Sequence, residues 1–432
     1  MKNLKVYIEK EGVQQFVGAI TGRDSTDAVF SYDREYLLHG SPISVSLPLR
    51  EQVFSPEQTR TFFEGLLPEG FSRKSVAQWI RADEQDYLTI LAALGRECLG
   101  ALLIEDADSP DGMNASYKML SMNQVRNLAA EGASRSAEIV VSSHLSLTGA
   151  SGKVGLYYDK KNNTWYQPFG IAPSTHIVKQ SHVRLRNIIE NEELALRTAM
   201  KLGIPTVESS IINTGTFGED EILLAAKRYD RDMDNSRFSI NELPAPLRLH
   251  QEDMAQALGI PSSRKYERKG DDYLRKMFLL VRNESTDPIG DQLRLLDVLI
   301  FDYLIGNTDN HIKNISLLYG PDLRKISLAP AYDILSTLVY KEGTAEMSVA
   351  IAGVMDWHDV SRETFINASS DIGISPQVIG REFDRLNGNF ADAVYSAADE
   401  LETSGLRHCR EIADAVMGLQ RGGFRSTGVP IY

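Results

Sequence analysis

The spacing of apolar positions along the chain changes from the period of strands to the period of helices. Residues 5–9, 16–20 and 43–47 alternate between apolar and polar side chains, as half-buried strands do. From about residue 56 the apolar positions recur with helical spacing, and Ser55-Pro56 supplies a cap residue followed by proline at the first helical position. We therefore expect a strand region followed by helices as far as about residue 96.

A second strand region is expected after the polar stretch 106–116, where we place a soft domain boundary. The expected strands are 139–142, which lies outside the residues that the structure describes, and 153–158, 164–167, 176–179, 207–212 and 222–227. Between strands 176–179 and 207–212 lies an amphipathic helix, and Asn191 is its expected cap. This region is therefore predicted to be rich in β structure.

After residue 250 the chain is predicted to be mainly helical. The clearest helix spans residues 292–305, and its apolar positions leave few faces for solvent, so it should be buried nearly all round. The order of elements predicts an α+β protein in three parts. These parts are residues 1–110, 111–245 and 246–432, that is, an added N-terminal subdomain, a β-rich lobe and an all-helical C-terminal lobe.

Composition narrows the class of protein. Apolar residues make up 42% and charged residues 24% of the 432 positions, which is ordinary globular usage and argues against disorder, collagen and coiled coils. Lys and Arg number 46 and Asp and Glu 59, so the net charge is −13 and the chain is a poor general binder of polyanions. Cys98 and Cys409 form no C-x-x-C pair, which disfavours a zinc site. With no secretory signal and no long apolar run, the cytoplasm is the expected compartment, with no membrane partner.

The first candidate for chemistry is the small-residue loop at 146–153, which leads into a strand. It consists of Ser146, Leu147, Thr148, Gly149, Ala150, Ser151, Gly152 and Lys153. Small residues let backbone N–H groups approach phosphate oxygens, and a lysine adds positive charge. The loop is not a Walker A motif, because its glycines are too close together and Val154 replaces the hydroxyl residue that would bind magnesium. By itself it also fits an ordinary hairpin turn.

The second candidate is Lys179, which ends an apolar strand. A protein kinase places its phosphate-binding lysine in such a position, and a glutamate from the next helix orients it. Glu192 and Glu193 open that helix here, and of the two we favour Glu192. The same residues also fit a lysine that reaches solvent and acidic residues placed near a helix N-terminus.

The third candidate follows the buried helix and is the most specific. In Gly306-Asn307-Thr308-Asp309-Asn310-His311-Ile312-Lys313-Asn314, the Asp309 to Asn314 spacing is that of the protein-kinase catalytic loop. Asp333 follows a short strand–turn–strand stretch, where a second metal-binding carboxylate would fall. Asp and Asn oxygens suit Mg²⁺. His311 lies inside the motif and would contact a nucleotide or orient the loop. Together these residues indicate phosphoryl transfer.

With these motifs in order, the chain resembles the HipA family of serine/threonine-protein kinase toxins over nearly its whole length. The N-terminal part of the resemblance rests on residues 48–50, FFEGLLPEG at 62–70 and LGRECLGA at 94–101. The remainder rests on THIVK at 175–179, KRYDR at 227–231, HQEDM at 250–254, IGNTDNHIKN at 305–314 and Tyr332-Asp333. The resemblance implies a two-lobed protein-kinase-like fold with the family's N-terminal subdomain at 1–110.

The resemblance also implies a role for each matching residue. Asp309 would be the catalytic base, and Asn314 and Asp333 would hold Mg²⁺. ATP would be bound by Lys179, by the loop residues Thr148, Gly149, Ala150, Ser151, Gly152 and Lys153, by the hinge Lys227, Arg228 and Tyr229, and by His311, Asn314, Tyr332 and Asp333. Ser146 stands where the family's loop carries an autophosphorylated serine. The chain departs from the family at Ser151-Gly152 and at Lys227, which replaces a glutamate.

The family pattern further implies partners. These are a dimeric helix-turn-helix antitoxin of the HipB type, operator DNA reached mainly through that antitoxin, and a protein substrate such as an aminoacyl-tRNA synthetase. Two other functions fit the same residues. One is a small-molecule kinase of the aminoglycoside phosphotransferase type, and the other is a catalytically silent corepressor of the antitoxin.

Overall fold

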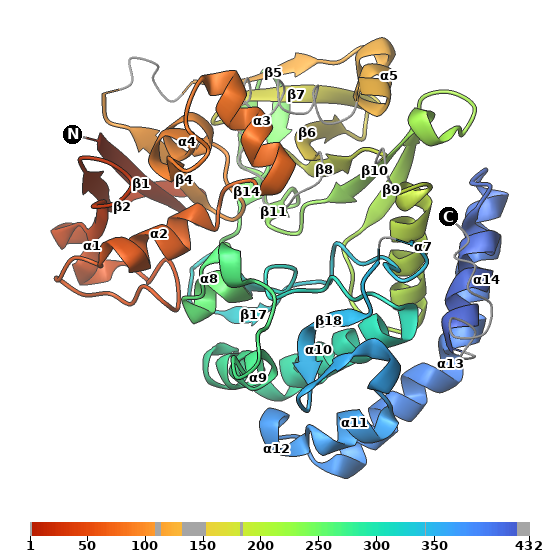
Figure 1. Ribbon diagram of the computed structural model, residues 1–432. Coiled ribbons are helices and arrows are strands. Elements are labelled where there is room, and N and C mark those ends of the chain that lie inside the picture. The colour runs from red at the N-terminus through yellow and green to blue at the C-terminus, as the bar shows by residue number, and fades with distance from the viewer. Residues whose placement is uncertain (1, 109–113, 132–152, 182–184, 342, 421–432) are drawn as a thin grey trace. The chain divides into compact units, whose positions relative to one another are not determined.

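The computed structural model describes residues 2–108, 114–131, 153–181, 185–341 and 343–420. The chain divides into two compact units, and each unit is built from three separate stretches of sequence. The first unit comprises residues 1–180, 223–262 and 317–326, and the second comprises 181–222, 263–316 and 327–432. Figure 1 labels their helices and strands. The predicted limits at residues 110 and 245 stay predictions.

Most strands lie wholly or mainly in the first unit. Its strands are β1 (Lys2–Lys10), β2 (Val13–Gly22), β3 (Val29–Tyr32), β4 (Leu102–Asp106), β5 (Ala115–Met119), β6 (Lys153–Asp159), β7 (Thr164–Gly170), β8 (His176–Lys179), β10 (Ile222–Lys227), β11 (Arg231–Asp232), β12 (Phe238–Ile240), β13 (Leu243–Ala245), β14 (Leu247–Arg248), β15 (Gln251–Asp253) and β16 (Ser316–Tyr319). Its helices are α1 (Arg34–His39), α2 (Pro56–Glu64), α3 (Gly70–Ile80), α4 (Tyr87–Leu94), α5 (Met122–Glu131) and α8 (Met254–Leu258).

An antiparallel sheet of order β3-β2-β1-β4 begins the first unit. Leu4, Val6 and Ile8 alternate along β1 and are fully buried, as the two-residue period predicts. Helix α2 starts where the sequence predicted, because Ser55 and Gln58 form a capping box and Pro56 is the first helical residue. A second sheet places β5, β7, β6, β8 and β10 side by side in that order.

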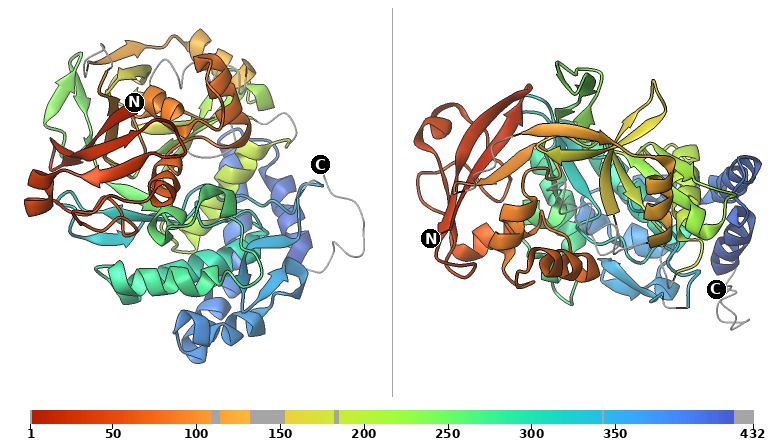
Figure 2. Two further views of the ribbon diagram at one scale, coloured as in Figure 1. Left: turned by 60° about the vertical axis from the view of Figure 1, so that its left-hand side comes forward. Right: turned by 90° about the horizontal axis from the view of Figure 1, so that it is seen from above.

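The second unit is built mainly from helices. Its elements are α7 (Ile188–Lys201), β9 (Ser209–Asn213), α9 (Tyr273–Glu284), α10 (Pro288–Ile305), β17 (Ile326–Leu328, of which the last two residues belong here), β18 (Glu346–Ile351), β19 (Val354–Asp356), α11 (Arg362–Asn367), α12 (Ser369–Ile372), α13 (Pro376–Thr403) and α14 (Cys409–Gln420). Helix α10 packs against α9 and α13, and α7 packs against α13 and α14. The last two helices lie side by side in both views of Figure 2.

Several sequence predictions are confirmed and two are wrong. The predicted helix 292–305 is α10, which starts earlier because Asp287 caps it and Pro288 follows. Residues 43–47 do not form a strand, because side chains take the place of a neighbouring strand: Tyr32 accepts from the N–H of Ile43, and Glu252 accepts from the N–H of Val45. Asn191 is no cap but lies buried inside α7, whose cap position is residue 187. The helical lobe also carries the hairpin β18–β19.

Candidate active site

The loop predicted to be catalytic starts at a sharp helix end in the second unit. Helix α10 ends at Gly306, whose φ of +74° lies in the left-handed region. A Cβ at this residue would lie 2.8 Å from Cδ1 of Leu419, the end of a flexible side chain that can move aside, so it is the left-handed backbone that favours glycine here. The chain therefore leaves the buried helix abruptly, and in the loop that follows Asp309 is the exposed residue.

Asp302, near the end of α10, fixes this loop through hydrogen bonds. Its carboxylate accepts hydrogen bonds from the side-chain amides of Asn307, at 2.8 Å, and Asn310. Burial raises the pKa of Asp302 to about 7, and the two amide hydrogen bonds offset only part of that rise. Asp302 of α10 and two polar side chains of the motif thus fix the loop, and none of the three was predicted as a site residue.

Asp309 is the exposed residue of the loop. Its Oδ1 accepts a hydrogen bond from the hydroxyl of Tyr266 at 2.8 Å. Its carbonyl accepts from the backbone N–H of His311 at 2.8 Å and from Nδ2 of Asn314 at 3.3 Å. His311 is buried and its ring lies edge-on to that of Tyr266 at 5.2 Å, and its role in nucleotide contact or in orienting the loop stays a prediction. The carboxylate of Asp309 is therefore held in place while it stays accessible.

The two predicted magnesium ligands, Asn314 and Asp333, are both half-buried. The hydroxyl of Tyr332 donates to the carbonyl of Lys313 at 3.0 Å and is 2.7 Å from Ser316 Oγ, so the residues directly before both ligands are joined. Asp333 has a φ of +58°, a strained conformation that is frequent at functional sites.

This donor set fits Mg²⁺, because one amide and one carboxylate oxygen leave room for phosphate oxygens and water. Among the described residues, no cluster of three or more His, Cys, Asp or Glu side chains could hold a metal ion. A metal at this site would therefore also need phosphate oxygens or water as ligands. The hydroxyl of Tyr332 is engaged with the loop, and a contact of this residue with ATP stays a prediction.

Asn191, which we predicted to be a helix cap, fixes the segment that follows Asp333. Its Nδ2 donates to the carbonyl of Ser336 at 2.9 Å and to the hydroxyl of Tyr340 at 3.1 Å, and its Oδ1 accepts from the N–H of Ser336 at 2.9 Å. This segment forms one wall of a pocket of about 440 Å³ that also contains Asp309. Helix α7 thereby stabilises a wall next to the predicted base.

The predicted phosphate-binding lysine belongs to the first unit. Lys179 is the last residue of β8, where it lies opposite Lys153 on β6, and its side chain is largely buried. In the second unit, Glu193 of α7 is paired with Arg197 at 2.8 Å. The predicted pairing of Lys179 with Glu192 or Glu193 stays a prediction. Ser146, Thr148, Gly149, Ala150, Ser151 and Gly152 lie outside the described residues.

The predicted hinge follows β10 in the first unit. Lys227 is exposed, and the backbone N–H of Arg228 already donates to the carbonyl of Thr175 at 2.9 Å. The hydroxyl of Tyr229 donates to Gln251. A contact to adenine through this segment stays a prediction, and it would have to use backbone groups other than the N–H of Arg228.

The side chain of Arg228 belongs to a buried ionic network that the sequence analysis missed. Glu97 accepts from Arg228 at 3.1 Å, Arg231 at 2.9 Å and Arg248 at 2.8 Å. Asp230 pairs with the first two arginines, at 2.6 and 3.0 Å, and Glu9 with Arg248 at 3.2 Å. Burial alone would raise the pKa of Glu97, but the three arginines outweigh it and lower the pKa to about 2.

The missed residues had weak signals in the sequence. Glu97 lies in LGRECLGA and Arg228 and Arg231 lie in KRYDR, two of the strings that carried the family resemblance. Opposite charges in two such strings suggest buried pairs, since an unpaired charge is rarely buried. Tyr266 had no signal, because it lies 43 residues before Asp309.

Comparisons with known proteins agree over almost the whole chain. Residues 4–105 match the HipA N-terminal domain and residues 145–394 match the HipA-like C-terminal domain. A Sinorhizobium fredii protein named "Putative kinase Y4mE" is 29% identical over 419 residues, which cover 94% of this chain and 95% of that protein. The serine/threonine-protein kinase toxin HipA of Shewanella oneidensis is 26% identical over 355 residues, or 77% of this chain and 76% of that one.

A solved structure shows the same fold. The HipA chain in a complex of HipA, HipB and operator DNA from Shewanella oneidensis has a TM-score of 0.77 and 22% identity, and the match covers 99% of this chain and 100% of that one. The match confirms the predicted α+β, two-lobed, kinase-like fold class. Across the described ranges, no helix is both long and apolar enough to cross a membrane.

Proposed function

The chain belongs to the HipA family, and from this premise we propose that it is an ATP-dependent serine/threonine-protein kinase that acts as a toxin. One observation carries the proposal. In the second unit, hydrogen bonds fix the loop that presents the Asp309 carboxylate. The hydroxyl of Tyr332, the residue before Asp333, donates to the carbonyl of Lys313, the residue before Asn314. Phosphoryl transfer depends mostly on positioning and on neutralising charge. This arrangement supplies the positioning, and its carboxylate and amide oxygens suit a metal ion that would supply the positive charge.

In the proposed reaction, ATP and Mg²⁺ would supply, when bound, the transferable phosphoryl group and a positive charge. Asn314 and Asp333 would hold the metal through their side-chain oxygens, and Lys179 would hold the phosphates. Asp309 takes the proton of the acceptor hydroxyl at its carboxylate oxygen as that hydroxyl becomes the nucleophile. Asp302 keeps the loop in register through Asn307 and Asn310, so little reorganisation is needed during the step.

The proposal extends to partners and regulation. The solved relative was studied with HipB and operator DNA. For this chain we propose a dimeric helix-turn-helix antitoxin of the same kind, DNA contact mainly through it, and a cytoplasmic location. The acceptor would be a serine of a protein, for which an aminoacyl-tRNA synthetase is the family-based candidate. Ser146 would be the chain's own acceptor.

The experiment that tests this proposal replaces the carboxylate of Asp309 with a neutral amide. We expect Asp309→Asn to lower phosphate transfer from radiolabelled ATP by at least about 100-fold, as loss of a general base does. Asp414→Asn is the matched control, because Asp414 of α14 also accepts from an exposed tyrosine hydroxyl, Tyr395, at 3.0 Å. Full activity of Asp309→Asn would refute the assignment of the base.

The same assay separates the competing functions. The wild-type protein should label protein serines, including its own Ser146, in the presence of Mg²⁺. Transfer to small hydroxyl compounds and to no protein would favour the small-molecule kinase. Absence of Mg²⁺-dependent ATP binding by calorimetry would favour a catalytically silent corepressor.

A further inference from the structure

The pocket of about 440 Å³ beside Asp309 lies entirely in the second unit, and hydrogen bonds between the segments that line it fix its shape. Ser348 of β18 donates to the carbonyl of Thr308 through its N–H at 3.0 Å and through its hydroxyl at 2.6 Å. Glu267 donates its N–H to the carbonyl of Ser348 at 2.9 Å and accepts from the N–H of Ala350 at 2.8 Å. Strand β18, the 266–267 segment and the loop at Asp309 therefore form one hydrogen-bonded wall.

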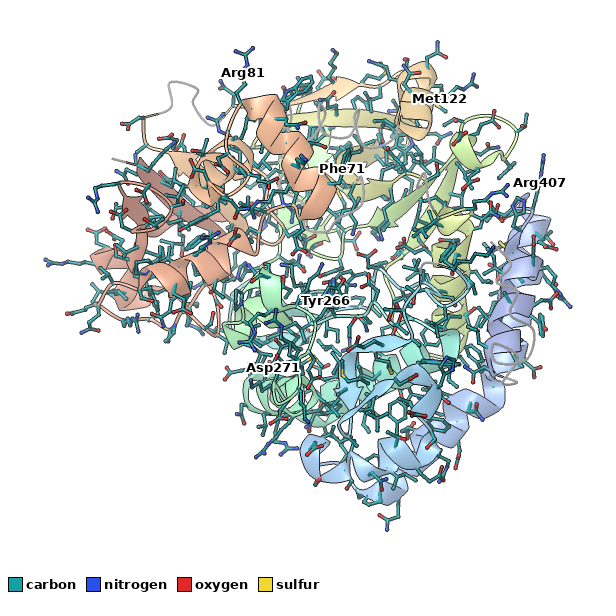
Figure 3. All side chains as sticks on the ribbon, viewed as in Figure 1. Phe71, Arg81, Met122, Tyr266, Asp271 and Arg407 are labelled. Carbon is teal, nitrogen blue, oxygen red and sulfur yellow. The ribbon has the colours of Figure 1, made fainter. Side chains whose placement is uncertain are left out.

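Tyr266 marks where an acceptor hydroxyl would sit. Its side chain is 47% exposed, and its hydroxyl donates to Asp309 Oδ1 at 2.8 Å. A hydroxyl group that donates to the carboxylate of a general base is the arrangement a substrate serine must reach before transfer. Figure 3 labels Tyr266 on the segment between α8 and α9. Tyr266 and Asp309 both line the pocket, so the pocket lies next to this hydrogen bond.

The charge of the pocket indicates what it accepts. Its described lining includes the acids Glu267, Asp309 and Glu346 and contains no Lys, Arg or His. It also includes the apolar side chains Leu335, Met347 and Met355. Such a pocket repels phosphates, and it suits a side chain with an aliphatic stem and a cationic head.

A second pocket, of about 570 Å³, provides a contrast. It shares Glu267, Glu346 and Met355 with the first pocket, and the cations Arg268, Lys269 and Arg275 line it. The second pocket also contains the acids Asp272 and Asp371, so its charges are mixed, whereas the charged side chains that the structure describes in the pocket containing Asp309 are all negative. The pocket beside Asp309 therefore favours a substrate cation over a substrate anion.

We propose that the pocket beside Asp309 receives a lysine or arginine next to the acceptor serine of a protein segment, and that Tyr266 occupies the acceptor's position until the segment displaces it. The inference rests on the proposed kinase function. Glu346 is the specificity-determining residue, because it is exposed and lines the pocket. Tyr266 is a positioning residue, since it competes with the acceptor for a single carboxylate oxygen.

The first test uses serine peptide libraries in which each flanking position is fixed in turn as Lys, Arg, Met or Glu. With wild-type protein and Mg²⁺-ATP, we expect Lys or Arg to be preferred over Met at one flanking position by at least about threefold, the size of a partly exposed ion pair. Glu346→Gln should abolish that preference. Glu411→Gln, which removes an exposed carboxylate of α14 far along the chain, should keep it. Equal use of Lys and Met, or a preference for Glu, would overturn the inference.

The second test separates displacement from simple support of Asp309. If Tyr266 occupies the acceptor's position, Tyr266→Phe should lower the KM for the peptide by about two- to tenfold, because one competing hydrogen bond is lost. Tyr395→Phe is the matched control, since Tyr395 makes the equivalent bond to Asp414. A fall in kcat with an unchanged KM would show that Tyr266 only supports the base. Wild-type protein that labels no peptide or protein would refute the kinase function itself, whereas labelling with no flanking preference refutes only this inference.

Discussion

Glu97 should be among the residues on which the stability of the first unit depends most. Its fully buried carboxylate lies among Arg228, Arg231 and Arg248, and Asp230 and Glu9 complete a network of three cations and three carboxylates. Glu97→Gln keeps the volume of the side chain but leaves one buried positive charge without compensation. Glu97 and Glu9 precede residue 105, and the arginines follow residue 145, so the network joins the two domains that the family models match.

Two routes give the size of the effect. Breaking a buried ion pair by removing one partner costs about 3–5 kcal/mol. The pKa of Glu97 falls from its ordinary 4.5 to about 2 in the folded protein, and at about 1.4 kcal/mol for each pKa unit this difference corresponds to about 3 kcal/mol. The two routes agree, so we expect Glu97→Gln to lower the free energy of unfolding by at least about 3 kcal/mol at pH 7.

The pH dependence follows from the direction of the pKa change. The folded-state pKa of Glu97 is depressed, so its contribution to stability is complete above its ordinary pKa of 4.5. The contribution is lost as the pH falls from 4.5 toward about 2, because protonation then removes the charge that the arginines stabilise. The difference in stability between wild type and Glu97→Gln should therefore be constant from pH 7 to pH 5 and should shrink below pH 4.5.

The assay is thermal unfolding followed by circular dichroism between pH 7 and pH 3, with Glu51→Gln as the control because Glu51 is exposed in the same unit. A loss of about 3 kcal/mol in a unit of this size lowers the unfolding midpoint by roughly 6–12 °C. Because Arg228 belongs to the proposed hinge, the variant should also raise the KM for ATP. A midpoint within 2 °C of wild type at pH 7, or a difference that does not shrink in acid, would refute the reasoning.

Three further variants test how the site is held together. Asp302→Asn should lower kcat about tenfold in steady-state kinetics and leave the KM for ATP unchanged, because an amide cannot accept both hydrogen bonds from Asn307 and Asn310; an unchanged kcat would contradict this. Tyr332→Phe should raise the Mg²⁺ concentration for half-maximal activity about three- to tenfold, and an unchanged Mg²⁺ titration would argue against the tie to Lys313. Asn191→Ala removes three hydrogen bonds and should cost about 2–4 kcal/mol of stability by thermal unfolding; a loss below 1 kcal/mol would show that α7 does not support the pocket wall.

The sequence by itself determined the elements whose signals are local. The capping box at Ser55 and the helix that ends at Gly306 are short-range features, because caps and left-handed glycines act within a few residues. The spacing of Asp309 and Asn314 is equally local. The ordered strings of the family resemblance identified the fold class for the same reason, since each string could be read without knowing what it contacts.

The tertiary structure alone decided which polar groups meet. The apolar–polar alternation at 43–47 predicted a strand, yet Tyr32 and Glu252 satisfy that backbone from distant parts of the chain. Asn191 resembled a helix cap, but its amide is used by Ser336 and Tyr340, about 145 residues later. Tyr266 reaches Asp309, and Glu97 reaches the arginines, in the same way. Periodicity reports only whether a side chain faces the core, whereas the partner of a buried polar group is fixed by packing between segments far apart in sequence.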